Sequence, residues 1–244
     1  MIKSSYKNIL ETGTVSLSAG TEDSNYPLYR LYDRNIGRFF KTTSAITTEI
    51  KIDQGSSPQA VDRLLIPSGH NLNGMTLDIK YSDDDITYTP AISQWTGASG
   101  LIDKSWASIT KRYWKFIITT PASIPQIAEL FLTQTYEWER NPSRPGEHLD
   151  PLFNIEREES FGGQVRFLIK GDPRKQRFYH VRCVGETQKN NILTLNDVWS
   201  GGKPFWFYDH EGNWLFGELK NPINIKEVSY QKYDFDFEFM EVIP

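Results

Sequence analysis

The residues best able to do chemistry, histidine and cysteine, have spacings that match no common catalytic or metal centre. The histidines are His70, His148, His180 and His210, and their spacing fits neither H-x-H nor HExxH. The single cysteine, Cys183, lies in an alternating stretch typical of a strand, which favours a small packed side chain over a nucleophile. No GxSxG, P-loop or GxGxxG motif occurs in the chain. We therefore expect no catalytic residue, no cofactor and no metal site, in a protein that is not an enzyme.

A run of three carboxylates, Asp83, Asp84 and Asp85, is the next candidate for chemistry. Hard cations such as Ca²⁺ bind clustered oxygen ligands, so such a run could contribute to a calcium site. Consecutive side chains cannot all point at one ion, however, and the spacing of an EF-hand loop does not follow. We interpret the run as a solvated polar turn.

A third kind of chemistry is sugar binding, which needs an aromatic ring against the apolar face of the sugar and polar partners for its hydroxyl groups. The loop residues of these types are Tyr29, Tyr32, Arg34, Asn35, His70, Asn71, Asn73 and Trp95. Five of them, Tyr32, Arg34, His70, Asn71 and Trp95, form the predicted site. The alternative is structural: His70 and Asn71 build a turn, and Trp95 belongs to the core. We favour the structural alternative and keep the five residues as the candidate glycan site.

These candidates are organised around residues 62–85, which predict two strands joined by a structured loop. The apolar run at 64–66 ends at Pro67, and residues 68–74 are rich in Ser, Gly and Asn, which favour turns. Apolar and polar residues then alternate over 75–81, as in a strand with one solvated face. The segment predicts one unit of an antiparallel sheet.

The remainder of the first half carries further short alternating segments separated by polar turns. Strands are predicted at residues 6–20, 47–52, 112–119 and 127–133, a short helix or turn within 22–40, and a long loop with one short strand at 91–111. About eight short strands at such spacing are typical of a β-sandwich or jelly roll.

The sequence GHNLNG at 69–74, followed by YSDDD at 81–85 and by strands at 112–116 and 127–132, resembles the discoidin-like (galactose-binding-like) jelly rolls. The resemblance covers about residues 5–135. The form with GHNLNG is similar to domains in tail and baseplate proteins of tailed bacteriophages. Some discoidin-like domains hold a structural cation near a loop aspartate, a position to which Asp33 or Asp53 would correspond.

The second half changes character at residues 136–152, where three prolines and several charges predict a linker. We therefore predict a jelly roll at 1–135, a Pro-rich linker at 136–152 and a smaller α+β domain at 153–244, in a chain that is mainly β. The predicted elements of the smaller domain are a strand pair at 163–170 and 177–184, a helix at 190–200, a hairpin of 204–208 with 214–219, and a final strand pair at 223–228 and 233–242.

This C-terminal layout, a sheet plus one helix, resembles the domains of phage distal-tail and tail-tube proteins, which assemble into rings. In the last predicted strand aromatic residues alternate with acidic residues, so one face of the strand is aromatic and the other is acidic. Its aromatic residues, Tyr233, Phe235, Phe237 and Phe239, are the predicted oligomer interface, although the same pattern suits a core equally well.

Composition limits the choice of partners. The formal net charge of −4 does not favour nucleic acid, and no stretch approaches the roughly 18 apolar residues of a membrane span. The N-terminus lacks the apolar segment of a signal peptide, and one cysteine excludes an intramolecular disulfide. We expect a chain that folds in a reducing cytoplasm, with no nucleic-acid partner and no membrane span.

The resemblance and the composition together predict a non-enzymatic virion structural protein of a phage tail tip or baseplate. It would form a homo-oligomeric ring, contact other phage tail proteins, and be made in the host cytoplasm before joining the virion. The alternative is a carbohydrate-binding module that mediates attachment to a host surface glycan.

Overall fold

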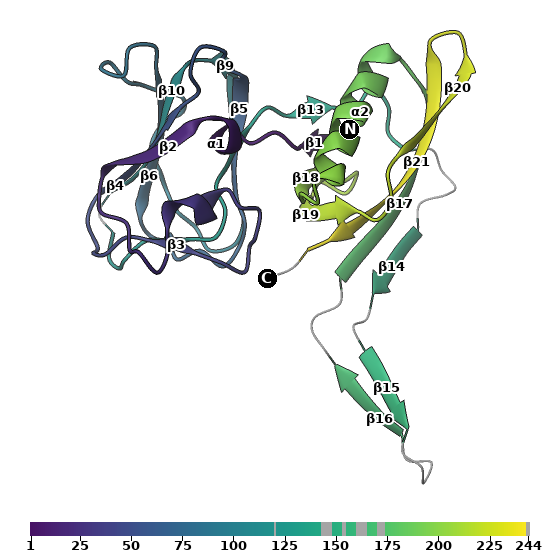
Figure 1. Cartoon of the computed structure of the whole chain (residues 1–244), viewed down its shortest axis with the longest axis horizontal. Coiled ribbons are helices and arrows are strands. Elements are labelled where there is room, and N and C mark those ends of the chain that lie inside the picture. Colours follow the sequence, from purple (N-terminus) through teal and green to yellow (C-terminus); the bar gives the residue numbers. More distant parts are fainter. Residues whose placement is uncertain (120, 143–147, 153–154, 160–164, 170–173, 243–244) are drawn as a thin grey trace. The chain divides into compact units, whose positions relative to one another are not determined.

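The computed structural model describes residues 1–119, 121–142, 148–152, 155–159, 165–169 and 174–242 (Figure 1). Contacts within the chain divide it into two compact units. One is Lys7–Thr135, called here the jelly roll. The other, called the second unit, combines Met1–Tyr6 with Tyr136–Ile243.

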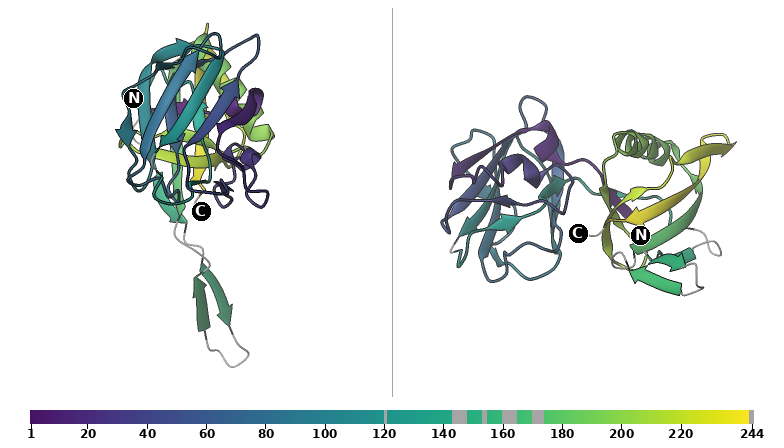
Figure 2. Two further views of the ribbon diagram at one scale, coloured as in Figure 1. Left: turned by 90° about the vertical axis from the view of Figure 1, so that its left-hand side faces the viewer. Right: turned by 60° about the horizontal axis from the view of Figure 1, so that its bottom comes forward.

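The jelly roll is a sandwich of two antiparallel sheets, so the predicted fold class is confirmed (Figure 2). The larger sheet has the order β2 (Thr14–Ala19), β4 (Thr48–Asp53), β10 (Tyr113–Thr119), β6 (Thr76–Ser82) and β7 (Thr89–Pro90), with β8 (Trp95–Thr96) also on β6. The smaller sheet has the order β12 (Phe131–Thr133), β5 (Ala60–Ile66) and β9 (Ile102–Thr110). Short segments complete the unit: α1 (Ile9–Thr12), the 3₁₀ turn η1 (Leu28–Leu31), and the pair β3 (Phe40–Lys41) with β11 (Gln126–Ile127).

Alternation along the strands forms the core of the jelly roll. In β10, Trp114, Phe116 and Ile118 face inward, and Ile50 and Ile52 of the neighbouring β4 lie beside them; all five are fully buried. Burial of each such side chain contributes about 1.5–3 kcal/mol, so the apolar face of each strand packs toward the core.

Two predictions for the jelly roll need correction. Residues 91–111, predicted as a long loop with one short strand, contain two strands, β8 and the nine-residue β9. Strand β9 pairs only with β5 among the described strands and is largely exposed, so few of its positions carry the apolar signal that predicts a strand. The single strand predicted at 127–133 is two strands, β11 and β12, which belong to different sheets.

The second unit is built on one antiparallel sheet with the order β13-β1-β18-β19-β21-β17-β14, and β20 pairs with β21 beside β19. The strands are β1 (Lys3–Ser5), β13 (Tyr136–Glu137), β14 (His148–Leu152), β17 (Arg174–Val184), β18 (Phe205–Tyr208), β19 (Trp214–Leu219), β20 (Asn224–Ser229) and β21 (Lys232–Glu241). The predicted hairpins β18–β19 and β20–β21 are confirmed by their pairing.

The N-terminal strand β1 lies between β13 and β18, so the second unit uses both ends of the chain and the jelly roll is inserted between β1 and β13. This division differs from the predicted domains at 1–135 and 153–244. Strand β1 is three residues long and has no apolar alternation, and its partners are far away in the sequence. Part of the predicted linker is also strand, because β13 and β14 both fall within it.

A single long helix, α2 (Glu186–Ser200), is described between β17 and β18, and it buries Ile192 and Leu195 in the core of the second unit. It begins four residues before the predicted start. The Glu139 carboxylate accepts hydrogen bonds from the backbone N–H groups of Gly185 (2.7 Å) and Gln188 (3.3 Å). A cap from a residue so distant in sequence leaves no local signal for the helix start.

The pair β15 (Ile155–Glu159) and β16 (Val165–Ile169) hydrogen-bond only to each other among the described strands. The predicted pairing of 163–170 with 177–184 is therefore wrong, since β17 pairs with β14 and β21. Neither helix in the parts of the chain that the structure describes has both the length and the apolar character needed to cross a bilayer.

Candidate functional site

The loop that precedes β6 uses two of the predicted sugar-binding residues to hold itself in place. His70 Nδ1 accepts the Leu72 N–H (3.1 Å), so the proton lies on Nε2, which donates to the Gly100 carbonyl (2.7 Å). The Asn71 amide donates to the Ile124 carbonyl (2.7 Å), and its oxygen accepts the Gln126 N–H (2.7 Å). Burial lowers the pKa of His70. Both side chains therefore connect loops.

Arg34, a third predicted residue, lies inside the jelly roll with 6% of its surface exposed. Its guanidinium pairs with Glu11 (2.5 Å) and lies 5.1 Å from the ring centre of Phe131. Its backbone N–H donates to the fully buried Glu129 carboxyl (2.9 Å). Tyr32 follows η1 and is half-buried against the core.

Trp95, on β8, is also half-buried and packs against the core of the jelly roll. Lys104 Nζ lies 5.6 Å from its ring centre, and its indole N–H is buried without a hydrogen-bond partner among the described residues. The five predicted residues thus have different local contacts, and the glycan site that they would form stays a prediction.

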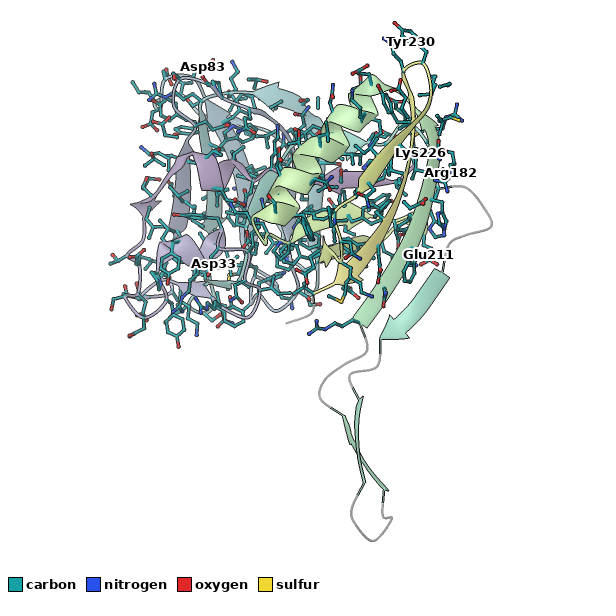
Figure 3. All side chains as sticks on the ribbon, turned by 45° about the vertical axis from the view of Figure 1, so that its right-hand side comes forward. Asp33, Asp83, Arg182, Glu211, Lys226 and Tyr230 are labelled. Carbon is teal, nitrogen blue, oxygen red and sulfur yellow. The ribbon has the colours of Figure 1, made fainter. Side chains whose placement is uncertain are left out.

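A depression of about 370 Å³ lies instead at the other end of β6, where the Asp83 turn leads into β7. Figure 3 labels Asp83 at this end of the jelly roll. The residues that line it are Tyr81, Ser82, Asp83, Asp84, Thr87, Thr89 and Lys111. Its volume is within the range of roughly 300–1,000 Å³ that is typical of small-molecule sites.

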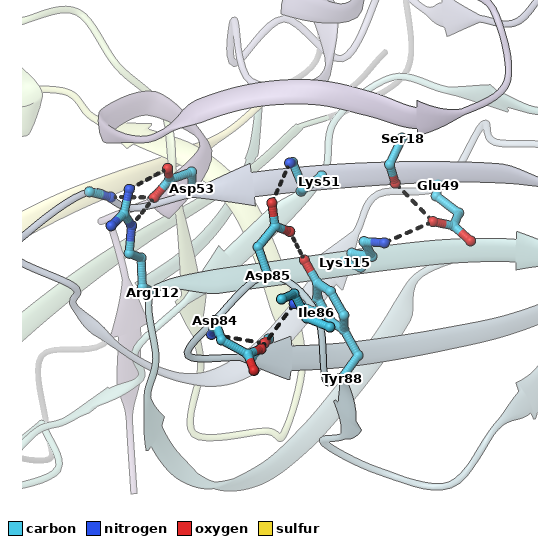
Figure 4. Close-up of polar contacts among 12 residues, drawn as sticks. Ser18, Glu49, Lys51, Asp53, Asp84, Asp85, Ile86, Tyr88, Arg112 and Lys115 are labelled. Carbon is cyan, nitrogen blue, oxygen red and sulfur yellow. Dashed lines mark hydrogen bonds and ion pairs between the residues drawn. The ribbon is translucent and has the colours of Figure 1, made fainter.

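The turn that forms one wall is fixed by its own carboxylates (Figure 4). Asp84 Oδ1 accepts from the backbone N–H groups of Thr87 (2.8 Å) and Ile86 (2.9 Å) and from the Ser82 hydroxyl (2.8 Å). These hydrogen bonds, the Thr87 bond first, lower the pKa of Asp84 to about 2. The wall is therefore ordered before any ligand arrives.

The next residue anchors the same turn to the outer face of the larger sheet. The Asp85 carboxylate accepts from Lys51 Nζ (2.8 Å) and from the Tyr88 hydroxyl, as drawn in Figure 4. Lys115 Nζ lies 4.4 Å from the Tyr88 ring centre and pairs with Glu49 (3.1 Å). The turn is thus held by β4 and β10 as well as by its own backbone.

The opposite wall comes from the β9–β10 connection. Lys111 Nζ pairs with Asp83 (2.6 Å), and this hydrogen bond raises the pKa of Lys111. The Lys111 carbonyl accepts the Trp114 indole N–H (3.0 Å). The Tyr81 ring lies 5.8 Å from the Trp114 ring, and the Trp106 ring lies 6.0 Å from the same Trp114 ring. Tyr81, which lines the depression, therefore belongs to an aromatic cluster of the jelly roll.

The two perturbed charged groups of the depression suit binding better than acid–base catalysis. A general acid or base works best with a pKa near the working pH. Here the pKa of Asp84 is lowered and that of Lys111 is raised, so both groups keep their charge near neutrality. What remains is an aromatic wall with fixed hydrogen-bonding groups around it.

The aspartates predicted as alternatives for a cation have other partners. Asp53 is bound by both arms of the Arg112 guanidinium (2.7 and 2.9 Å), which lowers its pKa to about 2. Asp33 accepts the Asn35 N–H (2.9 Å), and burial raises its pKa. Within the described residues no three His, Cys, Asp or Glu side chains come together as a metal site.

The predicted interface residues Tyr233, Phe235, Phe237 and Phe239 lie in the core of the second unit, with 9%, 2%, 6% and 0% of their surfaces exposed. Phe237 packs 5.1 Å from the ring of Trp138 and 5.0 Å from that of Tyr179. The sequence pattern suits either an oligomer interface or a core, and in the structure these residues form part of the core of the second unit.

The sequence identified the 82–85 turn as polar but not as a wall of the depression. Tyr81 and Lys111 are 30 positions apart and meet only because β10 pairs with β6. The usable local signal was Ser82-Asp83-Asp84, in which Ser and Asp side chains cap their own turn.

The fold and the depression define the first unit as a jelly-roll domain with a polar, aromatic-walled depression at one end. No family model matches the chain, and no curated protein matches it.

Solved structures do show similarity, at low TM-scores. The chitosan-binding module 1 of a chitosanase/glucanase from Paenibacillus sp. IK-5 is 19% identical (TM-score 0.45), and the match covers 52% of this chain and 99% of the module. CBM32-1 from a family 31 glycoside hydrolase of Clostridium perfringens is 17% identical (TM-score 0.44; 53% and 99%). A GH29 fucosidase of Ruminococcus gnavus is 20% identical (TM-score 0.46), and there the match covers 54% of this chain but 27% of the fucosidase chain. At these TM-scores we carry no function over from the three proteins.

Proposed function

We propose that the jelly roll is a non-enzymatic carbohydrate-binding module that takes a surface glycan in the depression beside Tyr81. The observation that carries this proposal is the depression itself: about 370 Å³, with one aromatic wall and a fixed polar rim.

Each group of the depression has a part in binding a sugar. The Tyr81 ring offers an apolar surface to the C–H face of a pyranose. Lys111 donates to hydroxyl oxygens, and Asp83 accepts from hydroxyl groups, so the pair suits two neighbouring hydroxyls of one ring. Thr87 and Thr89 add exposed hydroxyl groups. Because the Asp84 bonds already fix the turn, little order is lost on binding.

The test is a glycan array with the full chain, followed by titration of any positive glycan against three variants. Tyr81→Ala and Lys111→Met should each weaken binding by roughly tenfold or more, as expected for residues at the centre of a site. The matched control is Tyr29→Ala, an exposed tyrosine (48%) in the η1 turn of the same unit.

Four outcomes are informative. Loss of binding in Tyr81→Ala but not in Tyr29→Ala supports the depression. Two further variants, Tyr32→Ala and Trp95→Ala, test the residues that the sequence predicted, and loss of binding in these but not in Tyr81→Ala would move the site to them. Loss only in Tyr29→Ala would move it to the η1 turn. An array without a positive glycan, with a folded chain, would remove the proposal.

A second candidate function is the structural one: a ring-forming, homo-oligomeric component of a phage tail tip or baseplate that contacts other tail proteins in the virion. This candidate is favoured by strands in the second unit that have an edge with no partner among the described strands. Strands β15 and β16 pair only with each other among the described strands, and β20 pairs only with β21 and is largely exposed. Unpaired edges are where another chain can add a strand.

Figure 3 shows the β20–β21 hairpin with Lys226 and Tyr230, whose side chain is 85% exposed at the tip. Light scattering of the full chain tests this candidate. A closed oligomer that loses mass when β15–β16 is replaced by a short Gly-Ser turn would support it, and a monomer at high concentration would count against it. The two functions are compatible, since a ring can carry a glycan-binding domain.

A further inference from the structure

The charge of the depression narrows the class of sugar that it can take, and this inference rests on the proposed function. Three charged groups line the depression: Asp83, Asp84 and Lys111. Their sum is −1. Two further aspartates of the jelly roll, Asp85 and Asp53, are each paired with a basic side chain and add no net charge.

The two carboxylates differ in how much of each is already used. The Asp83 side chain is 71% exposed, and the oxygen that pairs with Lys111 is Oδ2, so Oδ1 takes no part in this ion pair. In Asp84 the three turn hydrogen bonds all fall on Oδ1, so Oδ2 takes no part in them. Each carboxylate therefore has an oxygen that the turn does not occupy.

We propose that the depression selects its sugar by charge: it binds an amino sugar more tightly than its neutral counterpart, and it disfavours acidic sugars. A protonated amino group brings three N–H donors and a positive charge to the two carboxylates. The Lys111 ammonium does not oppose it strongly, because Asp83 lies 2.6 Å away and neutralises it. Because Lys111 is paired with Asp83, it also attracts a sugar carboxylate only weakly.

The expected effect is moderate, since the rim is exposed and water screens the charges. Exposed ion pairs contribute about 0.2–1 kcal/mol, which corresponds to roughly 1.5- to fivefold in affinity. The preference should shrink between low and physiological ionic strength, because the Debye length falls toward about 8 Å.

The test uses the full chain and monosaccharides of one stereochemistry at a time: D-glucosamine, D-glucose and D-glucuronate, then D-galactosamine, D-galactose and D-galacturonate. Binding is followed by NMR chemical-shift titration at low and physiological salt. The expected order in at least one series is amino, then neutral, then acidic, with roughly two- to fivefold between the first two at low salt.

Two variants make opposite predictions. Asp83→Asn brings the local charge to zero and should abolish the preference for the amino sugar. Lys111→Met makes the charge −2 and should enlarge that preference, while it weakens binding of the neutral sugar by removal of a donor. The matched control is Asp103→Asn, another aspartate of the jelly roll that pairs with a basic side chain, Arg63. It changes the total charge equally and should leave the preference intact.

Equal affinity for amino and neutral sugars at low salt would overturn the inference, as would a preference that Asp83→Asn leaves unchanged. No shift with either amino sugar would also overturn it. If neutral glycans still bind in the array and Tyr81→Ala still abolishes that binding, the proposed function survives such a failure. An empty array removes both.

Discussion

The two units of this chain are assembled in opposite ways. The jelly roll is one continuous segment, and each of its two larger sheets is built from strands within 130 residues of each other. The second unit is split: β1 from the N-terminus lies between β13 and β18, which come after the whole jelly roll. A continuous segment can complete its own core, whereas the split unit depends on both ends of the chain.

The cores of the two units also differ in their composition. The core of the jelly roll is mostly aliphatic, with Trp114 and Phe116 among the leucines and isoleucines. The core of the second unit is aromatic: Trp138 packs 5.1–5.9 Å from the rings of Phe207, Phe235 and Phe237. Large rings bury much apolar area per residue, which suits a smaller unit.

Removal of one tryptophan from each core gives the largest expected effect. Trp114→Ala should destabilise the jelly roll, and Trp138→Ala the second unit, by about 3–5 kcal/mol each, because a cavity replaces a fully buried ring. Calorimetry should show one transition shifted in each variant and the other unchanged. A single transition that moves equally in both would mean that the two units unfold as one, and the comparison would fail.

The next largest effect should come from a substitution in β1, the N-terminal strand of the second unit. Ser4→Pro should destabilise the second unit by several kcal/mol and spare the jelly roll. Ser4 is the middle residue of β1, it is buried, and its hydroxyl accepts the Trp138 indole N–H (3.0 Å). Proline there removes a strand N–H and this hydroxyl together.

The readout for Ser4→Pro is proteolysis at native temperature, with fragments identified by mass. Ser4→Ala is the matched control, since it removes the hydroxyl but keeps the strand. Protection of the whole chain in the proline variant would show that β1 is dispensable.

The pH dependence should distinguish the units as well. Burial raises the pKa of Glu129 well above its usual value, and Arg34 opposes this only in part. A raised folded-state pKa means that stability is greatest at low pH and falls as pH rises from the ordinary value near 4.5 through the raised value. The limiting slope is about 1.4 kcal/mol per pH unit for one proton.

Glu129→Gln should flatten that decline in the jelly roll and leave the second unit unchanged, as measured by denaturant midpoints against pH. Asp53 acts in the opposite sense: its pKa of about 2 is below the ordinary 3.8, so its contribution is lost as pH falls from about 4 toward 2. If Glu129→Gln does not alter the decline above pH 4.5, another group is responsible.

The smallest effect is at the start of α2. Glu139→Ala should destabilise the second unit by about 1 kcal/mol, because two helix N–H groups lose their acceptor. Glu137→Ala is the matched control, because this glutamate is exposed and pairs with Lys3 at 3.8 Å. Thermal unfolding should show a shift for the first variant and almost none for the second.

Much of the fold was predictable, and the elements that were not predicted share one cause: each depends on residues distant in the sequence. Alternating runs such as 75–81 and 112–119 predicted β6 and β10 within a residue or so, because each strand carries its own apolar face. Strand β1 was missed because it has no such face, and only a short strand was predicted where β9 extends over nine largely exposed residues; both strands pair with partners distant in the sequence. The helix start was missed because its cap comes from Glu139.

The candidate site shows the same limit. His70, Asn71 and Arg34 have side chains that suit a ligand, but the structure uses them to close loops and to fill the interior. Nothing local in the sequence distinguishes a polar side chain that faces a ligand from one that faces its own backbone.

By itself, the sequence determined that this protein is mainly β, that its first half forms a jelly roll, and that residues 82–85 form a polar turn. Those features follow from side-chain periodicity and turn chemistry, which are local. Only the tertiary structure decided that the N-terminal strand belongs to the second unit and that the last strand's aromatic residues are core. It alone also placed Lys111 opposite Asp83 beside Tyr81. Such meetings depend on strand register between distant segments, which is set by the packing of the whole unit.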